Sequence, residues 1–318
     1  YINSGSNMVG ALEVDGSLTL NDTTTLTVTG GADNTIGSTA TVSGKGELEL
    51  TGGELTVQST AANTSGFTGT VSVASGVDLT LETTGSSAGL GAGVIKTVAG
   101  ADVQVTGSSA STLTNTVEGA GALTVNLGNA DNLFRFDGDQ SDSGFTGTLN
   151  LTSGTIDLTE DDVLQGATLA TTSDSVIIVN DSESTADRTI GNLTLAGGVL
   201  DFGMIDTTKP TAGQIYVNGQ LLLSDSEQAT VKVDFGDLAD GNGQSAFGTD
   251  QKLYLIEGYQ NQVTNAESHF ILADGTKDEI RQTVTQHDDD VADLVYSNGK
   301  FGSDDDGIYV GWDLEQID

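Results

Sequence analysis

Short apolar–polar–apolar triplets follow one another from about residue 11 to residue 235, each preceded by a glycine or another turn residue. Apolar residues at every second position predict a β-strand with one buried face, because successive side chains of a strand point to opposite sides. The central residue, most often threonine, is expected to face solvent, and its apolar neighbours are expected to share one interior. Representative triplets lie at 18–20, 26–28, 48–50, 55–57, 71–73, 79–81, 123–125, 149–151 and 193–195.

A longer unit occurs twice along the chain. GKGELEL (44–50) returns as GAGALTV (119–125), and about twenty residues after each copy comes SGFTGT, at 65–70 and 143–148. Glycine tolerates backbone conformations that other residues avoid, so these stretches predict sharp corners. In each copy a phenylalanine is predicted to fill the interior at the corner between two glycines: Phe67 with Gly66 and Gly69, and Phe145 with Gly144 and Gly147.

The spacing of the triplets predicts the fold. Comparable triplets recur roughly every 20–30 residues, which is the length of one coil containing three short strands. Coils of this kind bury a continuous core by stacking on one another. A β-sandwich is the alternative, but it predicts Asn-Gly hairpin turns, and Asn218-Gly219 is the only such pair before residue 235. We therefore expect an all-β protein, a right-handed parallel β-helix with three strands per coil.

The composition changes after residue 235. A Gly/Asp-rich stretch at 235–251 is followed by longer, more aromatic predicted strands at 252–258, 269–275, 292–299 and 307–314. Asn298-Gly299 and Asp306-Gly307 have the composition of hairpin turns. We expect two domains: residues 1–235 form the β-helix with its internal repeats, and residues 236–318 form an antiparallel cap that covers the open end of the coils.

Charge and composition narrow the chemistry. The chain has no cysteine, which rules out disulfides, thiolate nucleophiles and cysteine-bound metals. Ten Lys and Arg against 46 Asp and Glu give a formal net charge of −36. Such a surface repels nucleic acids, sulfated glycans and anionic membranes. Nucleic acid is therefore not an expected partner.

Residues suited to catalysis are sparse. The two histidines, His269 and His287, have no nearby serine in a nucleophile motif, so packed or surface roles are expected for both. Polysaccharide-active enzymes on this fold need clustered carboxylates and usually a basic residue, and the chain contains three arginines. We expect no enzymatic activity and no cofactor, with a polysaccharide-active β-helix enzyme as the third-ranked alternative.

The segment NLFRFDGDQSD (132–142) is the first candidate for contact with a partner, because it is longer than the neighbouring turns and combines aromatic, basic and acidic residues. In the alternative interpretation, Phe134 and Phe136 face inward on a wall strand and Arg135 is an ordinary surface charge. Its carboxylates can bind calcium loosely, although Asp142 stands where an EF-hand loop needs glycine. The candidate ligand-binding residues are Phe134, Arg135, Asp137, Asp139, Asp142, Glu160, Asp161 and Asp162.

The two copies share the pattern G-x-G-x-L followed by F-x-G-x-[VL]-x-[VL], over 44–81 and 119–158. This pattern resembles the passenger-associated repeat of bacterial autotransporters. The closing segment, from KLYLIEG to GIYVGWDL, is similar to the autochaperone region that precedes their membrane barrel. The cysteine-free, acidic, Thr/Gly-rich strands most resemble AIDA-type adhesins.

The resemblance implies a passenger that reaches the cell surface of a Gram-negative bacterium by type V secretion. It implies attachment to host matrix proteins or glycans, a virulence function. Self-association that drives cell aggregation and biofilm formation is the alternative. Membrane contact would involve only a barrel domain outside this chain. Tyr1, in place of an initiator methionine, indicates a piece of a longer precursor.

Overall fold

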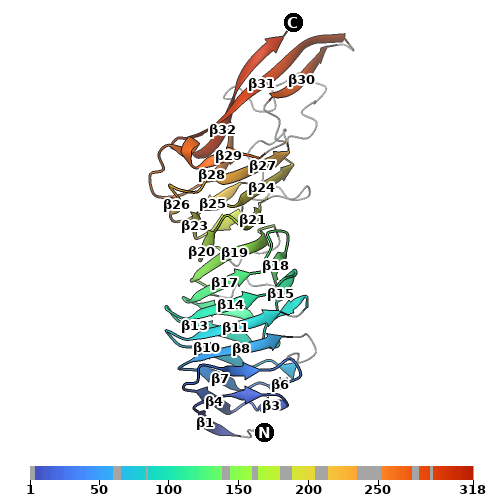
Figure 1. Ribbon diagram of the computed structural model, residues 1–318. Helices are drawn as coiled ribbons and strands as arrows, with labels where there is room; N and C mark the ends of the chain where they lie inside the picture. The colour runs from blue at the N-terminus through green and yellow to red at the C-terminus, as the bar shows by residue number, and fades with distance from the viewer. Residues whose placement is uncertain are drawn as a thin grey trace. The chain divides into compact units, whose positions relative to one another are not determined.

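The computed structural model of the protein describes residues 4–59, 66–83, 85–137, 144–159, 164–179, 188–204, 214–234, 252–273, 279–286 and 289–317. The fold is all-β: parallel strands stack as a β-solenoid of about eight turns, and an antiparallel sheet lies at the C-terminal end of the chain (Figure 1). The predicted fold class is confirmed. Contacts divide the chain into two compact units, Tyr1–Val176 and Ile177–Asp318.

In the first unit, successive strands take turns on three sides of each coil. The first sheet contains β1 (Gly5–Val9), β4 (Thr24–Val28), β7 (Glu47–Leu50), β10 (Thr70–Val73), β13 (Val94–Thr97) and β16 (Thr116–Gly119). The second sheet contains β2 (Glu13–Val14), β5 (Asn34–Ile36), β8 (Glu54–Ser59), β11 (Asp78–Thr83), β14 (Asp102–Thr106), β17 (Ala122–Asn126), the first half of β19 (Thr148–Asp157) and β20 (Thr168–Thr171). The third strands are β3 (Ser17–Leu20), β6 (Thr41–Gly44) and β9 (Gly66–Phe67), then β12 (Ser87–Ala88), β15 (Ser111–Leu113), β18 (Leu133–Phe136) and the second half of β19.

Parallel pairing in register places like side chains above one another. Leu48, Val71 and Ile95 occupy equivalent positions in three successive coils, 23 and 24 residues apart, and none of them exposes any surface. The central residues of the triplets, such as Thr80 and Thr124, are half-buried on the outer face. The alternation predicted from the sequence is therefore confirmed, and the core is a stack of Leu, Val and Ile.

The first copy of the repeated sequence builds a corner between β9 and β10. Phe67 pairs with Gly44 of the coil before it and is completely buried. Two residues later, Gly69 approaches the preceding coil so closely that a Cβ atom there would overlap the carbonyl oxygen of Gly46 and lie 2.9 Å from Cε2 of Phe67. Only glycine fits this position, and the phenylalanine fills the interior beside it, as predicted.

The second copy builds the same corner with the same contacts. Phe145 pairs with Gly119 and is 2% exposed. A Cβ atom at Gly147 would overlap the carbonyl oxygen of Gly121 and lie 2.9 Å from Cε2 of Phe145. This corner, however, leads from the first sheet into β19 of the second sheet, whereas the first copy leads from the third side into the first sheet.

In the second unit, parallel stacking continues and ends in an antiparallel sheet. The parallel sets are β22 (Arg188–Ile190), β25 (Ile215–Val217) and β28 (Lys252–Glu257); β23 (Asn192–Leu195) and β26 (Leu221–Leu223); and β24 (Val199–Met204), β27 (Ala229–Asp234) and β29 (Phe270–Leu272). β21 (Ser175–Ile178) spans the division between the units, and η1 (Ala266–Ser268) is a short 3-10 turn. β28 also pairs antiparallel with β32 (Gly307–Ile317), which pairs with β31 (Asp289–Ser303) and, through it, with β30 (Glu279–Gln286).

The C-terminal predictions have different outcomes. The boundary predicted between residues 235 and 236 falls within a stretch, 235–251, that lies outside the described residues, so it stays a prediction. Parallel pairing continues after this stretch in β28 and β29. Asp306-Gly307 lies where β31 turns into β32, as predicted. The hairpin predicted at Asn298-Gly299 is wrong: β31 runs through these residues, and its register with β32 shifts by one residue between Ser297 and Lys300, which makes a β-bulge.

Candidate functional site

The predicted contact segment at 132–142 is partly in the core. β18 places Phe134 and Phe136 inside, 0% and 7% exposed, with their rings edge to face and centroids 5.1 Å apart. Arg135 and Asp137 are exposed on the outer side. This is the wall-strand arrangement that the sequence left open as the alternative. Phe134 contributes to packing, while Arg135 and Asp137 are placed where a partner can reach them.

The remaining candidate residues Asp139, Asp142, Glu160, Asp161 and Asp162 lie outside the described residues. A loose calcium site at Asp137, Asp139 and Asp142 therefore stays a prediction. Within the described ranges, no three His, Asp or Glu side chains gather in a way that could hold a metal ion. Nδ1 of His269 donates a hydrogen bond of 2.9 Å to the carbonyl oxygen of Ser224, which is a packed structural role. His287 lies outside the described residues.

Polar side chains stack from coil to coil on the outer face of the first sheet. Thr27 Oγ1 donates to Glu49 Oε2 at 2.8 Å, and Ser72 Oγ donates to Glu47 Oε1 at 2.6 Å. Both bonds join strands of neighbouring coils, so each hydroxyl holds a carboxylate in place. These side chains are half-buried and keep part of their polar surface toward solvent.

The outer face of the second sheet has the same construction. Thr124 Oγ1 donates to Asp102 Oδ1 at 2.9 Å, and Gln58 Nε2 donates to Glu82 Oε2 at 3.3 Å. Across the two sheets, hydroxyl, amide and carboxylate groups therefore recur at the spacing between coils, about 4.8 Å. The result is an extended surface of repeated hydrogen-bond donors and acceptors, which we call the polar ladders.

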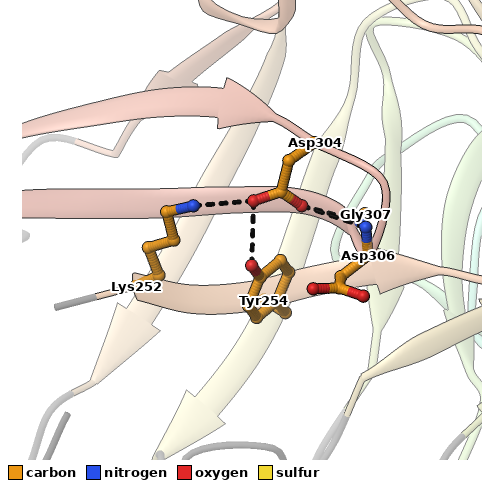
Figure 2. Close-up of polar contacts among 5 residues, drawn as sticks. All are labelled: Lys252, Tyr254, Asp304, Asp306 and Gly307. Atoms are coloured by element: carbon orange, nitrogen blue, oxygen red, sulfur yellow. Dashed lines mark hydrogen bonds and ion pairs between the residues drawn. The ribbon is translucent and has the colours of Figure 1, made fainter. Parts of the chain in front are cut away.

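A polar cluster that the sequence did not reveal lies in the C-terminal sheet (Figure 2). Asp304 begins the turn between β31 and β32. Its Oδ2 accepts hydrogen bonds from Lys252 Nζ at 2.7 Å and Tyr254 Oη at 2.9 Å, while its Oδ1 accepts from the backbone nitrogens of Asp306 at 3.0 Å and Gly307 at 3.3 Å. One carboxylate thus closes the turn and fastens it to β28. In the sequence, the D-x-x-G pattern from Asp304 to Gly307 indicates a turn, but it does not indicate that Asp304 has partners on another strand.

The cluster shifts the ionisation of its members. Burial raises the pKa of Tyr254 to about 12, and the hydrogen bond to Asp304 acts in the same direction. Burial alone would raise the pKa of Asp304, but the hydrogen bonds from Lys252 and Tyr254 hold that pKa below its usual value. The hydrogen bond to Asp304 raises the pKa of Lys252, whose ammonium also lies 4.3 Å from the centre of the Tyr309 ring. This arrangement stabilises one conformation of the sheet.

The shifted phenol predicts a loss of stability in alkali. A folded-state pKa of about 12 for Tyr254, against about 10 in an unfolded chain, means that the neutral phenol favours the folded state below pH about 10. That contribution is lost as the pH rises from about 10 through about 12. We expect the urea midpoint of the wild type to fall more steeply over this interval than that of Tyr254→Phe, which cannot ionise here. Equal slopes would contradict the assignment.

The chain matches no protein-family model and no curated protein sequence. Among the described residues, no helix has the length and apolar character needed to cross a membrane.

Proposed function

We propose that this chain is the β-solenoid passenger of a bacterial autotransporter adhesin, displayed on the outside of a Gram-negative cell. In this proposal it binds host matrix proteins or glycans and carries out no catalysis. The observation that carries the proposal is the pair of polar ladders on the first and second sheets. Many weak contacts along repeated groups add up to firm attachment when the ligand is itself extended. The resemblance of the repeats to the passenger-associated repeat supports the secretion route.

The charge of the chain selects among ligands. A net charge of −36 repels acidic partners. Neutral glycans and neutral or basic matrix proteins are therefore favoured over sulfated glycans. Binding to neutral ligands is expected to depend weakly on salt, because hydrogen bonds rather than ion pairs make most of the contacts, whereas binding to basic matrix proteins should weaken as the salt concentration rises.

Two matched triple variants test the proposal. Thr56, Thr80 and Thr124 stand in one column of the second sheet, and Thr25, Thr70 and Thr116 stand in one column of the first. We expect alanine at all three positions of one of these two columns to weaken attachment to a purified matrix protein or neutral glycan about tenfold or more, since each hydrogen bond lost contributes roughly 0.5–1.5 kcal/mol. The other triple variant serves as its control. Saturable binding that neither triple weakens, or no saturable binding at all, would contradict the proposal.

Self-association is the second candidate, favoured by the mixture of donors and acceptors within each ladder. A face that carries both Thr27 and Glu49, or both Ser72 and Glu47, can pair with the same face of a second copy. Sedimentation over a concentration series, with and without calcium, distinguishes the two. Reversible dimers at micromolar concentration that are lost when Glu47 and Glu49 are changed to lysine would place self-association first.

A further inference from the structure

Tyr216 is an exposed aromatic residue on the outer face of the second unit. It is the central residue of β25, between Ile215 and Val217, which are both completely buried. Tyr216 itself is 42% exposed. The alternation of the strand therefore directs this ring outward, so the ring does not serve to fill the core.

The ring rests directly on the backbone of the next coil. A Cβ atom at Gly258 would lie 2.6 Å from Cε2 and Cζ of Tyr216 and 2.8 Å from Cε1. Gly258 also has a φ of 80°, a conformation that favours glycine. An aromatic ring that covers a glycine on a neighbouring strand is held against the sheet. One side of the ring is covered by the glycine, so its exposed surface lies on the opposite side.

Tyr309 also packs over a glycine, but other side chains of the protein contact its ring. A Cβ atom at Gly302 would lie 2.6 Å from Cζ of Tyr309, so this ring also covers a glycine. The Tyr309 ring, however, has the ammonium of Lys252 at 4.3 Å from its centre and Tyr254 edge-on at 5.6 Å between centroids. Its surface is used within the protein, whereas the Tyr216 ring is presented to solvent.

Polar residues neighbour Tyr216 in the strand pairing and along the chain. Glu257 is its neighbour in the paired strand β28, and Asn218 is exposed two residues further along the chain. Gln260 is anchored there, because its Nε2 donates to the carbonyl oxygen of Asn218 at 2.7 Å and its backbone nitrogen donates to the carbonyl oxygen of Gly219 at 2.7 Å. A carboxylate and two amides thus lie near an exposed, preorganised ring.

We propose that Tyr216 is the stacking platform of a binding site for a neutral pyranose glycan, with Glu257, Asn218 and Gln260 as its hydrogen-bonding groups. A pyranose ring has an apolar C–H face and a rim of hydroxyl groups, so it needs a flat aromatic surface bordered by acceptors and donors. An apolar peptide side chain needs a desolvated pocket instead of a flat, exposed ring. The acidic surface disfavours sulfated and uronic sugars. The inference rests on the proposed adhesin function and specifies a glycan as one of its ligands.

The test is titration of the protein with neutral manno-, cello- and chito-oligosaccharides, with dextran sulfate as the acidic comparison. We expect saturable binding to at least one neutral series, weakened at least tenfold by Tyr216→Ala and retained by Tyr216→Phe. Leu222→Ala is the matched control, since Leu222 is 50% exposed on a different strand, β26, and should leave affinity unchanged. Circular dichroism checks that each variant is folded.

The other outcomes overturn the inference in distinguishable ways. Glycan binding that is unchanged in Tyr216→Ala refutes the site and leaves the adhesin proposal standing. The same holds if no neutral oligosaccharide binds while a matrix protein still does. Absence of both kinds of binding refutes the adhesin proposal as well. Preferential binding of tetramethylammonium, lost in Tyr216→Ala, would identify a cation site in place of a glycan site.

Discussion

Replacing Phe67 with alanine is expected to lower the free energy of unfolding by about 3–5 kcal/mol. The side chain exposes no surface and packs beside Gly69, whose backbone lies against the preceding coil. Parallel pairing on both sides of the corner fixes the backbone, so the coil cannot collapse into the space that the ring leaves. Phe145→Ala should have an effect of similar size, because the second copy of the sequence makes the same contacts.

Urea unfolding followed by circular dichroism measures this loss. Met8→Ala is a suitable control, since Met8 is 75% exposed and its truncation should change the free energy of unfolding by less than about 0.5 kcal/mol. A loss below about 1 kcal/mol for Phe67→Ala would mean that the corner tolerates a cavity, and the account of the repeated sequence given above would fail.

Gly119→Ala is expected to destabilise the protein by about 3 kcal/mol or more, because two costs combine. The residue has a φ of 94°, which is unfavourable for any L side chain, and a Cβ atom there would overlap the carbonyl oxygen of Thr97 in the coil before it. Gly76 separates the two costs. Its φ is 76°, but a Cβ atom there meets nothing within 4 Å.

Gly76→Ala should therefore lose only the conformational cost, about 1–2 kcal/mol. The comparison uses the same urea unfolding measurement on both variants. Equal losses would show that the neighbouring coil moves aside freely, contrary to the close stacking described for these corners.

The architecture of the solenoid could be predicted because each coil is specified locally. Alternation with a period of two determines which side chains are buried, and the sequence shows this alternation in triplets such as 79–81 and 123–125. The hairpin prediction at Asn298-Gly299 failed because the structure there is not specified by the local sequence. Its composition suits a hairpin turn, but pairing of β31 with β32 decides its structure, and that pairing extends the strand on both sides of it.

The surface sites were harder to predict than the fold. Composition marked the segment around Phe134 as unusual, yet only the strand alternation places Phe134 inside and Arg135 outside. The partners of Asp304 lie 50 and 52 residues earlier in the chain. Tyr216 likewise meets Gly258, which lies 42 residues further along the chain. Contacts of this kind depend on which strands become neighbours, which no local pattern specifies.

The same glycine–phenylalanine corner forms at two different positions of the coil, which allows a solenoid to lengthen by a fraction of a coil. Gly44 ends β6 on the third side and Gly119 ends β16 in the first sheet, 75 residues later, while successive coils in this region advance by 22–24 residues. The separation therefore corresponds to about three and one third coils. Duplication of such a segment shifts the phase of everything after it by a third of a revolution. A binding face copied in this way would reappear on a different side, so that duplication alone can distribute one recognition surface around the circumference.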